Sequence, residues 1–402
     1  MAKRADSPNS EGQAALFQPA PLPVARLDAA EKLACLRLIR SENVGAVTFR
    51  ELINHFGGAS RAIDALPELS RRGGRSRAIR PCAIEDAEAE LERAAKAGAT
   101  PLFTIEPGYP AALAAIDAPP PLLYVKGSAE LLSRPAIAIV GSRQCSAAGA
   151  KLASILARDL AGAGYIIASG LARGIDRVAH EMALPSGTVA VLAGGVDTIY
   201  PPEHAALQAR IAADGCLVSE RPPGFEARGK DFPRRNRIIS GISLAVVVVE
   251  AAARSGTLTT ARFAAEQGRE VFAVPGHPLD PRAEGTNKLI KTGAILVTEA
   301  SDVIDALRPI TGLAELGPGG PLGSVNSLSN HTPVCDAGTV DDAGRSQVLG
   351  ALSAAPADVD AIIRATGLPI RLVQIALMEL DLAGRLDRPG PGLVALRSAA
   401  DG

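Results

Sequence analysis

The 402-residue sequence lacks the features that mark several large classes of protein. Its five cysteines are scattered without a C-x-x-C pair, which argues against a disulfide framework and against a zinc ribbon. No apolar run approaches the length that spans a bilayer, and Met1 to Pro23 contains no continuous apolar segment of the kind found in signal peptides. Five histidines form neither an H-x-x-x-H nor an H-E-x-x-H pair. We therefore expect a cytoplasmic protein without a membrane segment or a metal site.

Two common nucleotide-binding fingerprints are also missing. Gly141-Ser142-Arg143 stands after the first strand of the central region, where a dinucleotide-binding protein would carry G-x-G-x-x-G. No G-x-x-x-x-G-K-[ST] loop occurs anywhere in the chain. Both NAD and ATP are therefore disfavoured as ligands, and no cofactor is expected.

The overall charge is balanced. A net charge of -1 and a pI near 6.6 mean that any nucleic-acid site has to be local. Hydrophobic content of 47% and charged content of 21% are ordinary for a soluble globular protein. The length exceeds what one hydrophobic core usually holds, so two or three domains are expected.

The chain divides where composition and periodicity change. Residues 311 to 343 contain no Lys or Arg and are dominated by Gly, Pro, Ser, Asn and Asp, which is typical of a linker. The basic run from Arg71 to Arg80 is interpreted as a solvated linker. Short helices are expected before it, the third at Ala62 to Leu66. The predicted divisions are a flexible tail (1–25), an N-terminal helical module (26–70), a linker with a connecting helix (71–108), an extended Rossmann-like domain (109–308), a flexible linker (309–344) and a winged-helix domain (345–398).

The middle third predicts an α/β fold. Apolar, β-rich runs alternate with helix-like stretches, and their hydrophobicity is continuous rather than alternating. Strands covered on both faces have this character, so we expect a doubly wound, mostly parallel sheet with crossover helices. The predicted strands are Ile137 to Val140, Ile166 to Ser169, Val189 to Leu192, Leu217 to Ser219, Leu244 to Val249, Val271 to Val274 and Ile295 to Val297.

The C-terminal region predicts a winged helix. Helices are expected at Ser346 to Leu352, Val359 to Thr366 and Ile370 to Ala383, and a β-hairpin at Gly384 to Leu396. The recognition helix of such a fold commonly enters the major groove. Here the charges are balanced: Arg345, Arg364, Arg371, Arg385, Arg388 and Arg397 are matched by Asp358, Asp360, Glu379, Asp381, Asp387 and Asp401. A protein-interaction or accessory role is as well supported as groove binding.

The densest local positive charge lies at Phe232-Pro233-Arg234-Arg235-Asn236-Arg237, with Lys230 just upstream. Guanidinium groups bind phosphate bidentately, and an aromatic ring can stack on a base. We interpret this segment as a turn that binds nucleic acid.

Glycines and small polar residues follow the predicted strands. In a parallel sheet the carboxyl ends of the strands meet at one edge, where helix N-termini expose unpaired N–H groups. Backbone donors from several such loops make an anion site, to which Arg143 adds a charge. The loops are Gly141-Ser142-Arg143, Ser169-Gly170, Gly194-Gly195, Ser255-Gly256-Thr257 and Pro275-Gly276.

Two groups of residues admit a catalytic interpretation. Asp176 and His180 share a helical face just after Ser169, but Ser169 lacks the G-x-S-x-G elbow of a hydrolase. A structural pair that locks the helix onto the loop is favoured. Glu220 and Glu250 both end predicted strands, and we favour a role in holding neighbouring arginines over catalysis.

An ordered set of motifs resembles the DNA-processing protein A (DprA/Smf) family from about Tyr109 to Ala306. The motifs are Tyr109-Pro110, Pro120 to Tyr124 with Lys126-Gly127, Val140 to Arg143, Ser169 to Asp176 with Ala179-His180, Phe232-Pro233 with Arg235 to Ile239, Ser255-Gly256-Thr257 and Gly285-Thr286-Asn287. The short Asn43-Val44-Gly45 turn is similar to that of helix-hairpin-helix modules.

The resemblance implies a protein without catalytic turnover that binds single-stranded DNA and loads RecA recombinase onto it. It also implies protection of incoming DNA in natural transformation, displacement of single-strand-binding protein, and a homodimer through the Rossmann-like domain. By the resemblance Arg143 contacts phosphate, Phe232 stacks on a base and Lys230 is a nearby basic residue. The candidate DNA-binding residues are Gly141, Ser142, Arg143, Ser169, Gly170, Arg173, Gly195, Lys230, Phe232, Arg234, Arg235, Asn236, Arg237, Ser255, Gly256 and Thr257.

Departures from the family pattern and two alternatives remain. After Tyr200-Pro201 the family often has a Lys and then an Asn, whereas this chain has Pro202 and His204, so one DNA contact is expected to be missing. One alternative is a Rossmann-like nucleotide or nucleoside monophosphate hydrolase, although the P-G-G-x-G-T-x-x-E signature of such enzymes is incomplete here. The other is a regulator that binds duplex DNA through the winged helix.

Overall fold

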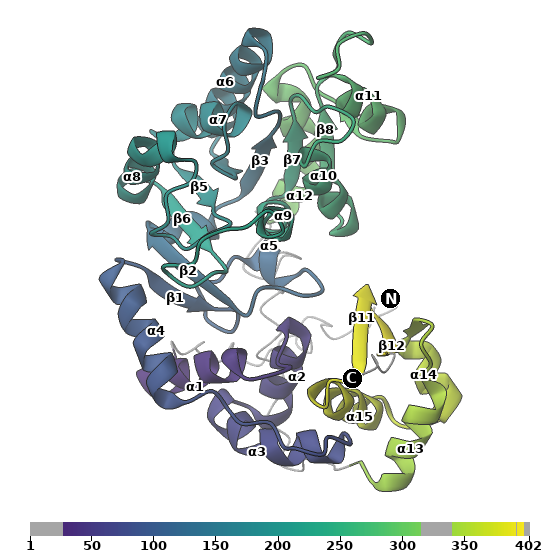
Figure 1. Cartoon of the computed structure of the whole chain (residues 1–402). Coiled ribbons are helices and arrows are strands. Elements are labelled where there is room, and N and C mark those ends of the chain that lie inside the picture. Colours follow the sequence, from purple (N-terminus) through teal and green to yellow (C-terminus); the bar gives the residue numbers. More distant parts are fainter. Residues whose placement is uncertain (1–26, 315–339, 391, 398–402) are drawn as a thin grey trace, which may run out of the picture.

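The computed structural model describes residues 27–314, 340–390 and 392–397 (Figure 1). The predicted flexible tail (1–25) lies outside the described residues, as does most of the predicted linker (309–344). A group of N-terminal helices, an α/β sheet domain and a small C-terminal domain follow one another along the described chain. The C-terminal domain returns to pack beside the N-terminal helices, so the first and last domains of the described chain are in contact.

The N-terminal unit consists of α1 (Ala29–Arg40), α2 (Ala46–Phe56), α3 (Ala59–Arg72) and α4 (Ile84–Lys96). Asp28 caps α1 by accepting a hydrogen bond from the backbone N–H of Glu31 at 2.8 Å. Gly57 ends α2 with a φ of 72°, a left-handed conformation that glycine adopts without strain. Because α3 extends well beyond the predicted Ala62 to Leu66, it includes the first two arginines of the segment that the sequence assigned to a linker.

Within the described residues, nine strands form one sheet in the order β1-β2-β6-β5-β4-β3-β7-β8-β9. Neighbouring strands from β6 to β9 in this order run parallel, so the predicted doubly wound, mostly parallel fold is confirmed. β1 and β2 were not predicted; they add antiparallel strands, and the sheet therefore begins at Thr100 rather than after the expected domain start at 109. The strands are β1 (Thr100–Phe103), β2 (Leu122–Gly127), β3 (Ala136–Val140), β4 (Ile166–Ser169), β5 (Thr188–Val191), β6 (Cys216–Ser219), β7 (Ala245–Val248), β8 (Glu270–Ala273) and β9 (Ile295–Leu296).

Helices cover both faces of this sheet, which explains its unbroken apolar strands. Along β3, Ile137 and Ile139 face a core with α6, α7 and α12, whereas Ala138 and Val140 face one with α5, α9 and α10. Alternate residues of a strand point to opposite faces, so both sets are buried. The helices are α5 (Ala111–Ala114), α6 (Ala147–Gly162), α7 (Ile175–Ala183), α8 (Ala205–Asp214), α9 (Asp231–Gly241), α10 (Thr257–Glu266), α11 (Glu284–Lys291) and α12 (Ala300–Ala314), with 3-10 turns at Ala129–Ser133 and Pro202–His204. α12 extends into the segment predicted as a linker from residue 309.

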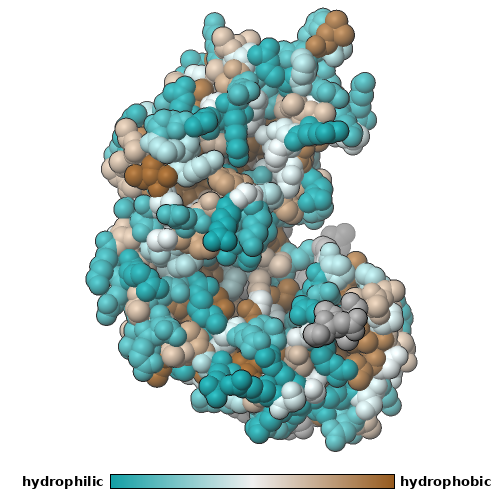
Figure 2. Space-filling model, viewed as in Figure 1, coloured by the Kyte–Doolittle hydropathy of each residue, from teal (hydrophilic) through white to brown (hydrophobic). Residues whose placement is uncertain are grey.

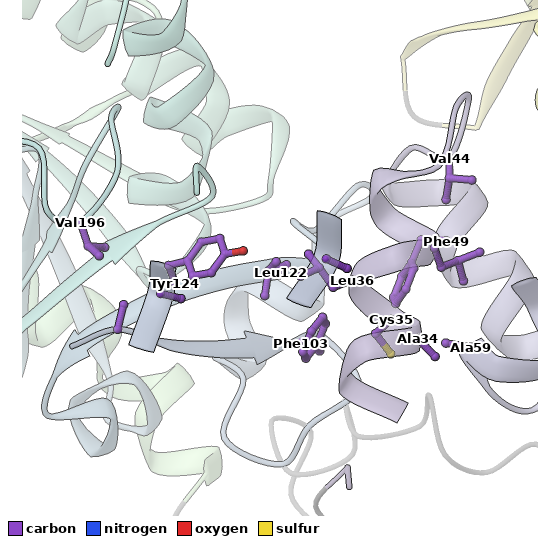
Figure 3. Close-up of a cluster of buried hydrophobic side chains, with 14 of the residues drawn as sticks. Ala34, Cys35, Leu36, Val44, Phe49, Ala59, Phe103, Leu122, Tyr124 and Val196 are labelled. Atoms are coloured by element: carbon purple, nitrogen blue, oxygen red, sulfur yellow. The ribbon is translucent and has the colours of Figure 1, made fainter. Parts of the chain in front are cut away.

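The antiparallel edge of the sheet shares its core with the N-terminal helices (Figure 3). Phe103, Leu122 and Tyr124 lie beside Leu36 and Cys35 in one cluster of buried side chains. A polar contact reinforces this junction, because the carboxylate of Glu90 on α4 accepts hydrogen bonds from the Arg40 guanidinium on α1 and from the Tyr124 hydroxyl on β2. The unpredicted strands therefore join the N-terminal helices to the sheet.

The C-terminal domain is a winged helix, as predicted. It consists of α13 (Asp342–Ala351), β10 (Ala357–Asp358), α14 (Val359–Thr366), α15 (Ile370–Leu382), β11 (Leu386–Gly390) and β12 (Leu393–Leu396), with the strands in the order β10-β12-β11. The predicted hairpin is β11–β12, whereas the short β10 was not predicted, and α13 begins three residues before the expected domain start at 345. Among the described helices, none is by itself long and apolar enough to cross a membrane. α14 and α15 meet that criterion only as a pair, and they are bent by 117°.

The C-terminal part of helix α15 is buried against the N-terminal helices, whereas Ile370, Arg371 and Gln374 near its start are exposed. Met378 and Leu382 belong to the same buried cluster as the core of α1 to α3. The amide of Asn43 donates to the Leu382 carbonyl at 3.0 Å, and the Thr48 hydroxyl donates to Asp381 at 2.7 Å. We call this packing of α15 on α2 and α3 the α15 contact. Figure 2 shows the hollow that the returning domain leaves beside the sheet domain.

Candidate nucleic-acid interface

The strand order places a crevice at the carboxyl edge of the sheet. β3 has β4 on one side and β7 on the other, so the chain leaves neighbouring strands toward opposite faces. The loop that follows β3 and the loop that follows the neighbouring strand therefore diverge and leave a crevice between them. Open α/β sheets bind their ligands in such crevices. A pocket of about 960 Å³ lies there, lined by loops that follow β3, β4, β5, β6 and β7.

The pocket gathers most of the residues that the sequence put forward. Residues from four segments far apart in the chain meet around it, which supports the expectation that the glycine loops share one edge. The candidates that line it are Gly141, Ser142, Arg143, Arg173, Phe232, Arg235, Asn236, Ser255, Gly256 and Thr257.

The other candidates lie elsewhere. Ser169 and Gly170 are buried beneath the loop that follows β4, and Gly195 is buried beside Pro222 and Asp197, where a Cβ would lie 2.7 Å from each of their oxygens. Lys230 is exposed just before α9, outside the pocket lining. Arg234 and Arg237 form a separate group, described next.

The basic and aromatic segment is a helix, not the turn that the sequence suggested. Phe232 and Pro233 occupy the first turn of α9, where proline is tolerated because the missing N–H has no helical partner. Positions four apart share a helical face, and Phe232 and Asn236 both face the pocket. Arg234 and Arg237 project instead toward Glu220, at 3.5 Å and 2.8 Å.

Arg235 forms part of the pocket floor. Its guanidinium is buried and donates to the carbonyls of Gly170, at 2.7 Å, and Val191, which end neighbouring strands. Burial lowers the pKa of Arg235 to about 10, and the nearby Asp176 carboxylate opposes that shift. The side chain therefore stays protonated near neutrality and places a positive charge under the pocket. A Cβ on Gly170 would lie 2.5 Å from this guanidinium, so only glycine fits there.

Asp176 and His180 hold the loop after β4 in place, as the structural interpretation predicted. Asp176 accepts hydrogen bonds from the backbone N–H groups of Gly170 at 3.1 Å and Ala172 at 3.4 Å. His180 Nε2 accepts from the Leu171 N–H at 3.3 Å. The Ser169 hydroxyl donates to the Ile139 carbonyl at 2.6 Å instead of to a histidine. Each group therefore has a structural partner.

The bonds of His180 define its tautomer. Its Nδ1 lies 2.8 Å from the Thr188 hydroxyl oxygen, and that hydroxyl itself donates to the Ile167 carbonyl at 2.7 Å. Nδ1 therefore carries the proton, and Nε2 is the acceptor. Complete burial lowers the pKa of His180 to about 3, since a charged ring would lose its hydration.

An arginine and two aromatic rings meet at the mouth of the pocket. The guanidinium carbon of Arg143 lies 5.6 Å from the ring centroid of Phe232, within cation–π range. The Tyr200 ring also contacts Phe232, with ring centroids 5.0 Å apart and planes inclined at 54°. Sequence reasoning missed Tyr200 and also Arg254, which is exposed and lines the pocket. Both residues follow predicted strands, Tyr200 after β5 and Arg254 after β7, and this position could have marked them as candidates for the carboxyl edge.

The start of α10 also borders the pocket. Gly256 precedes the first turn, and the Thr257 hydroxyl donates to the Gly141 carbonyl at 3.0 Å, which ties α10 to the loop after β3. The first N–H groups of α10 have acceptors within the chain: Thr257 donates to the Ser255 hydroxyl, and Leu258 and Thr259 donate to the carbonyls of Ser255 and Gly256. At the start of α6 a carboxylate takes the corresponding place, because Glu250 accepts hydrogen bonds from the backbone N–H of Ser146 at 3.0 Å and from its hydroxyl. Glu250 thus stabilises α6 rather than an arginine, whereas Glu220 does hold arginines.

The positions where the chain departs from the family pattern differ in exposure. Pro202 is exposed, but His204 is buried, with its Nδ1 3.0 Å from the Leu171 carbonyl. Arg173 pairs with the exposed Glu203 nearby. His204 therefore supports the loop after β4 and faces away from a ligand.

Fold and pocket together define a Rossmann-like protein with a pocket at the carboxyl edge of its sheet and a winged-helix partner domain. The family described as DNA recombination-mediator protein A matches residues 100–308, the DprA-like N-terminal HHH domain matches 29–93 and the DprA winged helix domain matches 336–390. The chain belongs to the DprA/Smf family of DNA-processing proteins.

Individual relatives agree with this assignment. Protein Smf of Escherichia coli (strain K12) is 42% identical over 294 residues, which cover 72% of this chain and 76% of the relative. DNA processing protein DprA of Streptococcus pneumoniae (strain ATCC BAA-255 / R6) is 44% identical over 207 residues, or 51% of this chain and 73% of the relative. The X-ray structure of DprA from Streptococcus pneumoniae matches 68% of this chain and 96% of that chain, with a TM-score of 0.59 and 34% identity.

Proposed function

We propose that this protein binds single-stranded DNA in the pocket at the carboxyl edge and acts as a recombination mediator that loads RecA. The observation that carries the proposal is the mouth of the pocket, where the exposed Arg143 adjoins the Phe232 ring. Among the described residues no ion pair involves Arg143, so its charge is available to a ligand. A cation beside an aromatic ring suits a strand with phosphates and unstacked bases.

In this proposal the phosphates lie along a path from Arg143 to the start of α10. Gly256 and Thr257 line the pocket there, and Arg254 adds an exposed charge. The buried Arg235 contributes electrostatic potential from the pocket floor, where its Nη1 donates to the carbonyls of Gly170 and Val191 and its Nε donates to Asn236. Binding through phosphates and one stacked base tolerates any sequence and weakens steeply with salt.

Other parts of the molecule support the remaining roles. β9 is the last strand of the sheet, and its Ile295 and Leu296 are 36% and 47% exposed. An apolar strand edge favours pairing with another chain, so we propose a homodimer through the Rossmann-like domain. The protein works in the cytoplasm on DNA entering during natural transformation, protects that DNA and helps to displace single-strand-binding protein. Binding rather than turnover is its activity.

The test is RecA assembly on single-stranded DNA that has been coated with single-strand-binding protein. We expect the native protein to shorten the lag before RecA filaments form, and the Arg143→Ala variant to lose most of that effect. An unchanged lag with the protein demonstrably bound to the DNA would contradict the mediator role. Release of free base from nucleoside monophosphates would contradict the absence of turnover.

A further inference from the structure

Tyr200 is set apart from the other tyrosines of the chain. The sequence contains four tyrosines and no tryptophan. Tyr109, Tyr124 and Tyr165 are at most 7% exposed, whereas Tyr200 is 48% exposed. The hydroxyls of Tyr109 and Tyr124 donate to Pro120 and Glu90, but no hydrogen bond to the Tyr200 hydroxyl is found within the described residues. Tyr200 is therefore the one tyrosine of the described residues that leaves a large part of its surface open to a ligand.

This ring stands at the mouth of the proposed DNA pocket. It lines the pocket together with Phe232, and the two ring centroids are 5.0 Å apart. Phe232 is half-buried and already contacts both Tyr200 and the Arg143 guanidinium. The more exposed ring, and so the larger free stacking surface, belongs to Tyr200.

The loop that carries Tyr200 is fixed on both sides of the ring. Before it, the Thr198 hydroxyl donates to the Phe225 carbonyl at 3.1 Å, and the Thr198 carbonyl accepts from the Gln208 amide at 3.0 Å. After it, Pro201 is buried and His204 lies 3.0 Å from the Leu171 carbonyl. A ring held in place before binding loses little conformational freedom when a ligand stacks on it.

We propose that Tyr200 stacks on a nucleobase of bound single-stranded DNA, next to the base that contacts Phe232. The inference rests on the proposed function and assigns to its site a second base-contacting ring. Aromatic stacking accepts every base, so Tyr200 adds affinity for unpaired bases without adding sequence preference. A base-paired strand cannot offer its face to the ring, so Tyr200 also favours single strands over duplex.

The test compares Tyr200→Ala, Tyr200→Phe and the native full chain, titrated with oligo-dT and with an abasic oligomer of equal length. We expect Tyr200→Ala to bind oligo-dT about five- to 150-fold more weakly, the range for one stacked base, and Tyr200→Phe to bind within about twofold of native. The abasic oligomer should bind all three proteins equally. Native affinity for oligo-dT in Tyr200→Ala, or an equal loss for both ligands, would overturn the inference.

Tyrosine fluorescence supplies a second readout. With no tryptophan present, oligo-dT should quench the native emission, and Tyr200→Phe should lose most of that quenching while it still binds. Quenching that persists in Tyr200→Phe would contradict the stacking. If native protein fails to bind oligo-dT at all, the proposed function fails and the inference fails with it. If native protein binds and Tyr200→Ala is unaffected, the inference alone fails.

Discussion

The pocket at the carboxyl edge and the α15 contact both contain arginines, but their charges are used differently. At the α15 contact Arg388 bonds Asp381 at 3.1 Å and Glu51 at 3.3 Å, and within the winged helix Arg345 bonds the buried Glu379 at 2.8 Å. At the pocket mouth, no carboxylate among the described residues pairs with Arg143 or Arg254. A charge neutralised inside the protein stabilises the fold, whereas an unpaired one at a crevice is available to a ligand.

The comparison also separates two ways of binding DNA. A winged helix reads duplex through its recognition helix, but here α15 has Met378 and Leu382 in the core of the N-terminal helices. The start of α15, with Ile370, Arg371 and Gln374, remains exposed. The carboxyl-edge pocket instead places the exposed Arg143 beside the Phe232 ring, which favours single-stranded DNA as its ligand over a duplex.

The largest effect is expected from Arg143→Ala. Charge-assisted hydrogen bonds contribute about 1.5–3 kcal/mol, so affinity for oligo-dT should fall about ten- to 150-fold. Loss of one phosphate contact should also make the slope of log affinity against log salt shallower by about 0.7. The matched control is Arg397→Ala on the winged helix, where the arginine is exposed and paired with Asp387. An equal loss of oligo-dT affinity in both variants would contradict the view that only the pocket arginine is available to DNA.

Replacing Phe232 by Ala should cost about 1–3 kcal/mol of binding free energy if the ring stacks on a base. Phe263→Ala on α10 is the control, because Phe263 lies outside this pocket. Thermal unfolding of both variants completes the measurement. If Phe232→Ala lowered the melting temperature and the binding in parallel, Phe232 would be a packing residue.

The support beneath the pocket should be sensitive to acid. The unfolded chain protonates His180 near pH 6.5, whereas the native chain keeps it neutral down to about pH 3. The free energy of unfolding should therefore fall as the pH drops through this window, by up to about 1.4 kcal/mol per pH unit from this residue. His180→Gln, which can still accept from the Leu171 N–H, should lose that part of the slope in denaturant titrations. His277→Gln, at an exposed histidine, should retain it.

The smallest effect on DNA binding is expected from opening the α15 contact. A Cβ on Gly73 would lie 2.0 Å from the backbone oxygen of Glu379, although φ of -67° at Gly73 suits alanine. Gly73→Ala should therefore displace α15 and raise the radius of gyration in small-angle scattering, with oligo-dT affinity unchanged. Gly350→Ala is the control, since nothing lies within 4 Å of its Cβ position. A large loss of affinity in Gly73→Ala would make the winged helix part of the site.

The sequence predicted the parts of the fold that are locally encoded. Strands β3 to β8 are continuous apolar runs because both faces are covered, and that pattern is visible without a structure. β1 and β2 were missed because they pair only with each other and with β6, through contacts distant in sequence. The segment from Phe232 to Arg237 was interpreted as a turn, although Pro233 is compatible with the first turn of a helix.

The candidate site was predicted in composition better than in geometry. The glycine loops and Arg143 could be placed at one edge because parallel strands share their carboxyl ends. Whether Arg234 and Arg237 face the pocket depends on the helical phase of α9, which the sequence did not reveal. Tyr200 reaches the pocket because of the path that the loop after β5 takes. Tertiary contacts of Thr198 and His204 set that path, so the sequence alone did not reveal it.

The most direct test of the central claim is a competition titration with the full chain. Labelled oligo-dT is bound first, and unlabelled oligo-dT or a matched duplex of equal length is then added at two salt concentrations. Displacement by duplex should require at least about tenfold more competitor than displacement by oligo-dT, and higher salt should weaken the single-strand complex steeply. Equal competition by duplex, or binding that ignores salt, would contradict a pocket built for a single strand.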